Sequence, residues 1–278
     1  MRNGKKATMF DPLPASVDWF SLANVREKLA DLPAALAQAM IQTRAKKSFE
    51  LGRDVRVVGP AELPPKPGLS KVEGQARLLH DLASIELQAM ELAVRTLCEY
   101  PEAPAEFRKE LSEIAAGEGR HLALCLDRME AMGFAWGHWD VHLTLWNTVG
   151  PQDTLLDRIL IVHRYLEGSG LDSGESILRR LVGVAGARAA KETVELIMRE
   201  EVDHVLFGSR WYRTIAEQTH IDPETDFRDR IAQIAQIAPR RDRVARELRR
   251  QAGFTPFEIA ELERLIKNEV ASHPSKKQ

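Results

Sequence analysis

The stretch REEVDHVLFGSRWY, residues 199–212, is the most informative part of the sequence for the fold. It places Glu201 and His204 three residues apart in a segment whose apolar residues recur at helical spacing. Residues three apart lie on the same face of a helix, so both side chains fall in the apolar stripe. Because an unpaired carboxylate is costly to bury, the stretch predicts a core helix that carries a polar site.

The same pattern occurs in EGRH, where Glu118 precedes His121. A lone glutamate lies in an apolar helical stripe ahead of each pair: Glu86 precedes Glu118 by 32 positions (118 − 86), and Glu167 precedes Glu201 by 34 (201 − 167). Each half of the chain therefore predicts a helical hairpin in which a glutamate faces a Glu-x-x-His pair. Two such hairpins make a four-helix bundle.

A third Glu-x-x-His pair, Glu217 and His220, serves as an internal control. Glu217 follows Glu201 by 16 positions (217 − 201). This separation turns it roughly 160° away around the helix axis. We expect the pair to lie on the surface and to take no part in the site.

The bulk composition indicates a soluble globular protein of one or two domains that favours helix. The chain has 278 residues, 44% hydrophobic and 29% charged, with a formal net charge of -2. Near-neutral charge gives no broad basic field for nucleic acid or membrane. No signal-type or bilayer-spanning segment is found, and Cys98 and Cys125 do not suggest a disulfide framework, so a cytoplasmic location is expected.

The predicted fold class is all-α: a four-helix bundle with a long crossover connection, an N-terminal helical extension and a C-terminal helical appendage. In the extension, Pro33 is expected to open a second helical segment. The predicted divisions are residues 1–69 for a helix and Pro-rich connector with one short strand, 70–220 for the bundle, and 221–278 for the charged appendage.

Local signals place several boundaries of these helices. Ser70 with Glu73, and Thr255 with Glu258, match the pattern of a capping box at a helix start. Three glycines in EGSGLDSG, residues 167–174, are expected to kink or interrupt the third bundle helix. The crossover, residues 134–153, holds three tryptophans; whether they line a substrate entrance or cap the bundle remains open.

Four glutamates and two histidines contributed in this way form the ligand set of di-iron and di-manganese carboxylate proteins. Four carboxylates nearly neutralise two divalent ions, and imidazoles favour iron over magnesium or calcium. The alternative is a buried polar network whose members pair with arginine or with one another. The predicted metal ligands are Glu86, Glu118, His121, Glu167, Glu201 and His204.

The motifs LLHDLASIELQAMEL, EGRHLALCLDRMEAMGF, LEGSGLDSGESI and REEVDHVLFGSRWY are similar to those of the ferritin-like di-iron carboxylate superfamily. Within it, the chain most closely resembles the bacterial family known as domain of unknown function (DUF) 455, over about residues 60 to 215. The resemblance implies the same six ligands. Gly119 departs from the alanine more usual at that position, which bears on helix stiffness and not on ligation.

Several neighbouring residues have open assignments. His163, one turn before Glu167, is a partner of that carboxylate, an extra ligand or a packed histidine. His80 is expected to form a hydrogen bond between helices, and Glu200 to pair with arginine at the surface. The Arg-rich run, residues 240–250, either binds phosphate or RNA or is a solvated helix paired with Asp242 and Glu247.

The resulting functional expectation is an oxidase or monooxygenase in which two iron ions, or manganese or a mixed pair, reduce dioxygen and a small organic substrate is oxidised. An external electron donor is then required, and the sequence specifies no catalytic residue beyond the ligands. The alternatives are ferroxidase or storage activity in an oligomer, hydroxylation of tRNA, and a metal-free interaction module. No membrane partner is expected.

Overall fold

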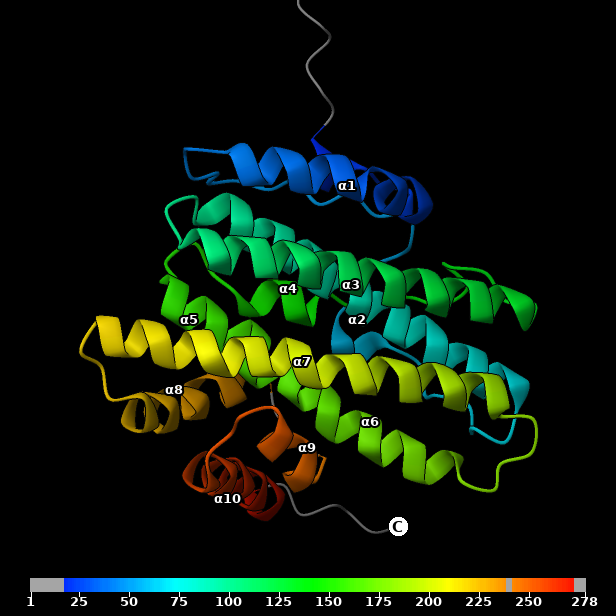
Figure 1. The fold of residues 1–278 in the computed structure, drawn as a ribbon. Coiled ribbons are helices and arrows are strands. Elements are labelled where there is room, and N and C mark those ends of the chain that lie inside the picture. The colour runs from blue at the N-terminus through cyan, green and yellow to red at the C-terminus, as the bar shows by residue number, and fades with distance from the viewer. Residues whose placement is uncertain (1–17, 239–241, 273–278) are drawn as a thin grey trace, which may run out of the picture.

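A computed structural model of the chain describes residues 18–238 and 242–272. In these residues the regular structure is helical, as the sequence predicts, and the expected short strand is reduced to a single β-bridge between Val57 and Val141 (Figure 1). None of the helices described is both long enough and apolar enough to cross a bilayer.

The helices differ greatly in length. Four long rods surround the predicted site: the helices α2, α3 and α7, and a third rod in chain order that α5, η3 and α6 form as one continuous run. The elements are η1 (Trp19–Ser21), α1 (Val25–Ile41), η2 (Pro60–Glu62), α2 (Val72–Glu99), α3 (Ala105–Ala131), α4 (Thr144–Thr148), α5 (Leu155–Ile159), η3 (Leu160–Leu166), α6 (Glu167–Leu181), α7 (Arg188–Gln218), α8 (Pro223–Ile237), α9 (Arg246–Gln251) and α10 (Pro256–Ser272).

Two long hairpins form the centre of the molecule. Helix α2 packs along α3, α6 packs along α7, and α7 also contacts both α2 and α3. Figure 1 shows α1 lying outside α3 on one side, and α8 to α10 lying beyond α7 and η3 on the other. A single large apolar cluster runs through these elements, with Leu79, Met90, Leu122 and Val205 fully buried.

The N-terminal helix α1 corrects one expectation, because it continues through Pro33 without a break. Asn24 caps it by accepting hydrogen bonds from the amides of Arg26 and Glu27. Its contact with α3 explains Gly119: a Cβ there would lie 2.7 Å from Cδ2 of Leu32. Gly119 therefore gives α1 room to approach, while α3 remains one continuous helix.

The two predicted capping boxes have different outcomes. Thr255 and Glu258 form theirs, with Thr255 N–H donating to Glu258 Oε2 at 2.8 Å and Glu258 N–H to Thr255 Oγ1 at 3.2 Å. The prediction for Ser70 is wrong, since α2 starts at Val72 and its N-cap residue, Lys71, makes no side-chain cap. A Cβ at Gly74 would overlap the carbonyl oxygen of Gly68, so this glycine allows the Pro-rich connector to lie against the start of α2.

The third rod is irregular before the glycines and not at them, contrary to the sequence prediction. Its wide π-helical turn, η3, ends at Leu166, and α6 then runs unbroken through all three glycines. Two of these glycines permit close approaches: a Cβ at Gly168 would overlap the guanidinium of Arg249, and one at Gly174 would overlap the thioether of Met198. Gly168 and Gly174 are therefore sites of tight packing, whereas a Cβ at Gly170 would meet nothing within 4 Å.

Two buried ion pairs attach the C-terminal appendage to this rod. Arg164 donates to both carboxylate oxygens of Glu258, at 2.9 and 2.7 Å. Arg249 donates to both oxygens of Asp172, at 3.2 and 2.7 Å. Bidentate pairs of this kind fix orientation as well as charge, so α9 and α10 are held firmly against the bundle.

Candidate metal centre

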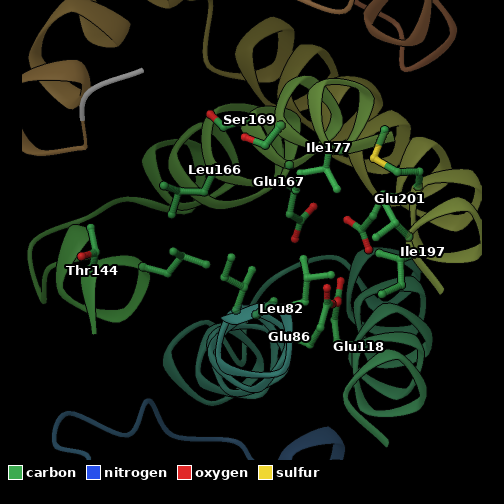
Figure 2. Close-up of a pocket in the computed structure, with 18 of the residues that line it drawn as sticks. Leu82, Glu86, Glu118, Thr144, Leu166, Glu167, Ser169, Ile177, Ile197 and Glu201 are labelled. Carbon is green, nitrogen blue, oxygen red and sulfur yellow. The ribbon is translucent and has the colours of Figure 1, made fainter. Parts of the chain in front are cut away.

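The six predicted ligands come from four helical rods that face one another. Helix α2 carries Glu86, α3 carries two ligands, α7 carries two, and Glu167 is the first residue of α6, directly after the π-helical turn. All six side chains are at least nine-tenths buried. Figure 2 shows the carboxylates of Glu86, Glu118, Glu167 and Glu201 directed toward one shared space.

His121 lies at the centre of three of these carboxylates. Its Nδ1 is 3.5 Å from Glu86 Oε2, 3.7 Å from Glu118 Oε2 and 3.3 Å from Glu201 Oε1. His204 Nδ1 is 2.8 Å from Glu118 Oε1 and 3.1 Å from Glu201 Oε1. Possible ligand atoms of Glu86, Glu118, His121 and Glu201 all lie within 4.8 Å of one another. The structure thus brings five predicted ligands into one connected cluster.

Glu167 stands slightly apart from this cluster. Its Oε1 accepts a hydrogen bond from His163 Nδ1 at 2.8 Å, which makes His163 a partner of this carboxylate. Glu167 nevertheless lines the same cavity as Glu86, Glu118 and Glu201. The imidazole of His163 is fully buried and packs edge-on against Phe207, so the orientation of Glu167 is held by the core.

The pKa shifts in the cluster show that protons on some of its side chains balance the negative charge of the others. Burial opposes ionisation of Glu118, but its interactions with the imidazoles of His204 and His121 outweigh burial and hold the pKa of Glu118 well below the usual value. Burial likewise disfavours charge on His204, but Glu118 and Glu201 raise its pKa to about 12. The pKa of Glu86 lies well above its usual value, because burial and the neighbouring carboxylates disfavour the anion. Protons here occupy positions for which cations would compete.

Unpaired atoms face into this site. Glu118 Oε2, Glu167 Oε2, Glu201 Oε1 and His121 Nδ1 are buried and have no hydrogen-bond partner. In the described residues no lysine or arginine forms an ion pair with any of the four carboxylates; only histidines do. Buried polar atoms are rarely left unpaired, so the donor set fits metal ions better than it fits a closed polar network.

One outer contact of the site was missed from the sequence. His121 Nε2 lies 3.1 Å from Glu200 Oε2, and Glu200 is also 3.7 Å from Arg120 Nη2. The expected surface pairing with arginine is therefore present, but the same carboxylate also orients His121, turning Nδ1 inward. Glu200 lies next to Glu201 on the helix, outside the apolar stripe, so no spacing rule identified it.

The control pair matches its predicted place, whereas the predicted partner of His80 is wrong. Glu217 and His220 are both exposed, and His220 lies beyond the end of α7. His80 is buried, stacks on Trp136 and accepts a hydrogen bond from the amide of Gly137 at 3.3 Å. Its partner is the crossover loop and not another helix. Neither set contributes to the carboxylate cluster.

The crossover loop divides between the two roles left open. Trp136 and Trp139 pack around His80, and Trp146 packs against Phe20, so the indoles cover the bundle. Residues 142, 144 and 145 of the same loop line the cavity beside the carboxylates. The tryptophans are thus a cap, and the cavity wall comes from their neighbours.

The arginines of the C-terminal run are largely engaged. Arg250 pairs with Glu247 as predicted, Arg246 pairs with Glu263, and Arg249 is buried. Asp242 accepts a hydrogen bond from Ser173 at 2.9 Å. Arg240 and Arg241 lie outside the described residues.

Comparison with known proteins identifies the family. The family described as "Protein of unknown function (DUF455)" matches residues 21–260. The chain belongs to the DUF455 family. The chain is also similar to an uncharacterized protein of Haemophilus influenzae. The two are 26% identical over 252 residues, which cover 87% of this chain and 84% of that protein. No solved structure matches the chain significantly. Membership of this family does not assign an activity to the chain.

Proposed function

We propose that this DUF455 protein is a ferritin-like di-metal carboxylate protein that oxidises a small organic molecule with dioxygen. The observation that carries the proposal is the cluster of buried carboxylates, which have no lysine or arginine partner in the part of the chain that the structure describes. Its composition matches the ligand set that ferritin-like bundles use for two metal ions. Iron is the first candidate, with manganese or a mixed pair as the alternatives.

The ligands divide between the two hairpins. Glu86, Glu118 and His121 would come from α2 and α3, and the second set, Glu167, Glu201 and His204, from α6 and α7. Glu200 would hold His121 in one tautomer, and His163 would hold Glu167 in position. Bound iron would supply the redox chemistry that allows dioxygen to react with an organic molecule.

The atom balance of the proposed reaction defines a further partner. In a monooxygenase reaction a substrate C–H bond becomes C–OH, and the second oxygen atom leaves as water. The two electrons and two protons required come from an external reductant, such as a reduced flavoprotein or iron–sulfur protein. In an oxidase reaction the substrate supplies the electrons and protons itself.

The cavity of about 410 Å³ beside the carboxylates favours this proposal over its alternatives. Cavities of this size hold small organic molecules. Ferroxidase or storage activity has no use for an apolar chamber of this kind. Hydroxylation of tRNA would require a basic surface, and Arg246, Arg249 and Arg250 are already paired with acids.

The proposal is tested by anaerobic titration with ferrous ion followed by exposure to oxygen. Uptake saturating at about two ferrous ions per chain, with oxygen consumed in proportion, is expected of this ligand set. A Glu118→Ala, Glu201→Ala double variant should consume none, whereas Glu217→Ala should match the natural protein. Continued uptake of many irons per chain would favour storage, and no uptake at all would overturn the proposal.

A further inference from the structure

The cavity beside the carboxylates has a wall that is mainly apolar apart from the glutamates. It lies between α2, α4, α6 and α7, and the four glutamates point into it, with Leu82 and Leu166 on one side of them and Ile177 and Ile197 on the other (Figure 2). The rest of the wall is mainly aliphatic, and it includes Leu82, Leu166, Ile177, Ile197 and Met198. Ile85, 39% exposed, places one part of this wall at the protein surface.

No lysine or arginine occurs in the part of the wall that the structure describes. A substrate carboxylate, phosphate or sulfonate held against this wall would therefore have no lysine or arginine as a counter-charge. Burying a charge without a partner is strongly unfavourable. The wall thus disfavours anions independently of the size or shape of the molecule.

Both serine hydroxyl groups in the wall are already engaged. Ser169 donates to the carbonyl of Tyr165 at 2.6 Å, and Ser173 donates to Asp242 at 2.9 Å. Each serine can still accept a hydrogen bond, but its proton is used. A strongly polar guest would consequently leave many of its own groups unpaired, which is costly in an apolar chamber.

We propose that this cavity selects a neutral, predominantly apolar small molecule and excludes anionic ones. The proposal rests on the proposed function, and it narrows the substrate to a class such as an uncharged hydrocarbon-rich or aromatic compound. Two divalent ions would nearly neutralise four carboxylates, so a cationic molecule would gain no special attraction. The substrate enters the cavity by burial of apolar surface, and its reacting end lies toward the glutamates.

A matched pair of fluorescent probes tests this directly. N-phenyl-1-naphthylamine is neutral, and 8-anilinonaphthalene-1-sulfonate has the same ring framework with one added sulfonate. In titrations of the full-length protein, the neutral probe should bind with one saturable site per chain and about tenfold or more tighter than the sulfonate. Equal affinity, or tighter binding of the sulfonate, would overturn the proposal.

Variants assign the binding to this cavity. Gly170 lies in the wall, and a Cβ there meets nothing within 4 Å, so Gly170→Phe can narrow the chamber without a clash at the backbone. It should weaken the neutral probe about fivefold or more, whereas Val182→Phe, at an exposed position outside the wall, should not. Equal effects from both substitutions would contradict the assignment.

A charge variant tests the basis of the selection. Ile85→Lys places a cation in the wall and should tighten binding of the sulfonate about fivefold or more. Val72→Lys is the control, because Val72 lies on the same helix, is 56% exposed and is not part of the wall. No greater gain for Ile85→Lys than for Val72→Lys would contradict selection by charge.

Metal content measured on the same preparations separates the two proposals. Metal without binding of the neutral probe would overturn the substrate class and leave the di-metal function standing. Selective binding of the neutral probe without metal, even after anaerobic loading, would support the cavity's selectivity and overturn the di-metal function.

Discussion

Two regions of this protein bury acidic side chains in different ways. At the contact between η3, α6 and the C-terminal appendage, Glu258 and Asp172 are each held by an arginine, Arg164 and Arg249, through two hydrogen bonds. At the centre of the bundle, the ion pairs that four glutamates form within the described residues are all with histidines. Both regions are buried, so solvent does not account for the difference.

The two regions differ in the group that balances the negative charge of the carboxylates. Arginine is a permanent cation, so its pairs are complete as soon as the chain folds. Histidine is neutral near pH 7 unless its surroundings protonate it, and neutral imidazole is a metal ligand. The ion pairs at the appendage therefore need nothing further to balance their charge, whereas the centre is balanced by protons, which metal ions would replace under the proposed function.

The largest effect should come from breaking an arginine pair. Arg164→Met leaves Glu258 buried without its main partner, and should lower the free energy of unfolding by about 3–5 kcal/mol in urea denaturation. Arg250→Met is the control, since its pair with Glu247 is exposed and should contribute about 1 kcal/mol or less. Similar losses in both variants would remove the distinction between the buried and surface pairs.

The centre should instead respond to added metal. Ferrous ion added anaerobically, at about tenfold above its Kd, should stabilise the folded protein by about 1.4 kcal/mol for each of two ions, about 2.8 kcal/mol together, and raise Tm by about 5–10 °C. Glu167→Gln should lose most of this rise, because it removes a charged oxygen donor from the site.

Glu175→Gln, on the same helix and exposed, should keep the full rise in Tm. A rise that is the same in all three proteins would place metal binding elsewhere on the chain.

His80 offers a buried group outside both regions. Burial lowers its pKa from 6.5 to about 4, so the unfolded chain takes up a proton below pH 6.5 that the folded chain refuses until about pH 4. The free energy of unfolding therefore decreases as the pH is lowered through that window, by about 2 kcal/mol from pH 7.5 to pH 5. Urea denaturation at both pH values should show that this share of the loss is absent in His80→Gln. An identical pH dependence in the variant would contradict this origin.

The smallest effect should come from the outer carboxylate of the centre. Glu200→Gln keeps the shape of the side chain but weakens its interaction with His121 Nε2. Metal affinity, measured by competition with a chelator, should fall about tenfold without loss of the sites. Complete loss of binding would show that Glu200 is itself a ligand.

Helical spacing was sufficient to predict the inner faces of the bundle, because residues that share a stripe must meet the same core. It placed Glu118 and Glu201 in one site and Glu217 outside it. The π-helical turn before Glu167 was not predictable, since the apolar pattern does not record an added residue within a turn.

Contacts between distant segments were also beyond local patterns. The partnership of Asp172 with Arg249, and of Glu200 with His121, depends on how separate helices pack. The glycines of residues 167–174 look like helix breakers in the sequence, but two of them have a tertiary cause: side chains of Arg249 and Met198 occupy the space that a Cβ at Gly168 or Gly174 would take.

The most direct test of the account is the metal content of the purified protein, measured by plasma mass spectrometry beside Glu201→Ala and Glu217→Ala. The account predicts about two iron or manganese ions per chain in the natural protein and in Glu217→Ala, and a sharp loss in Glu201→Ala. No transition metal after anaerobic reconstitution, or equal content in both variants, would contradict the claim that these buried carboxylates form a metal centre.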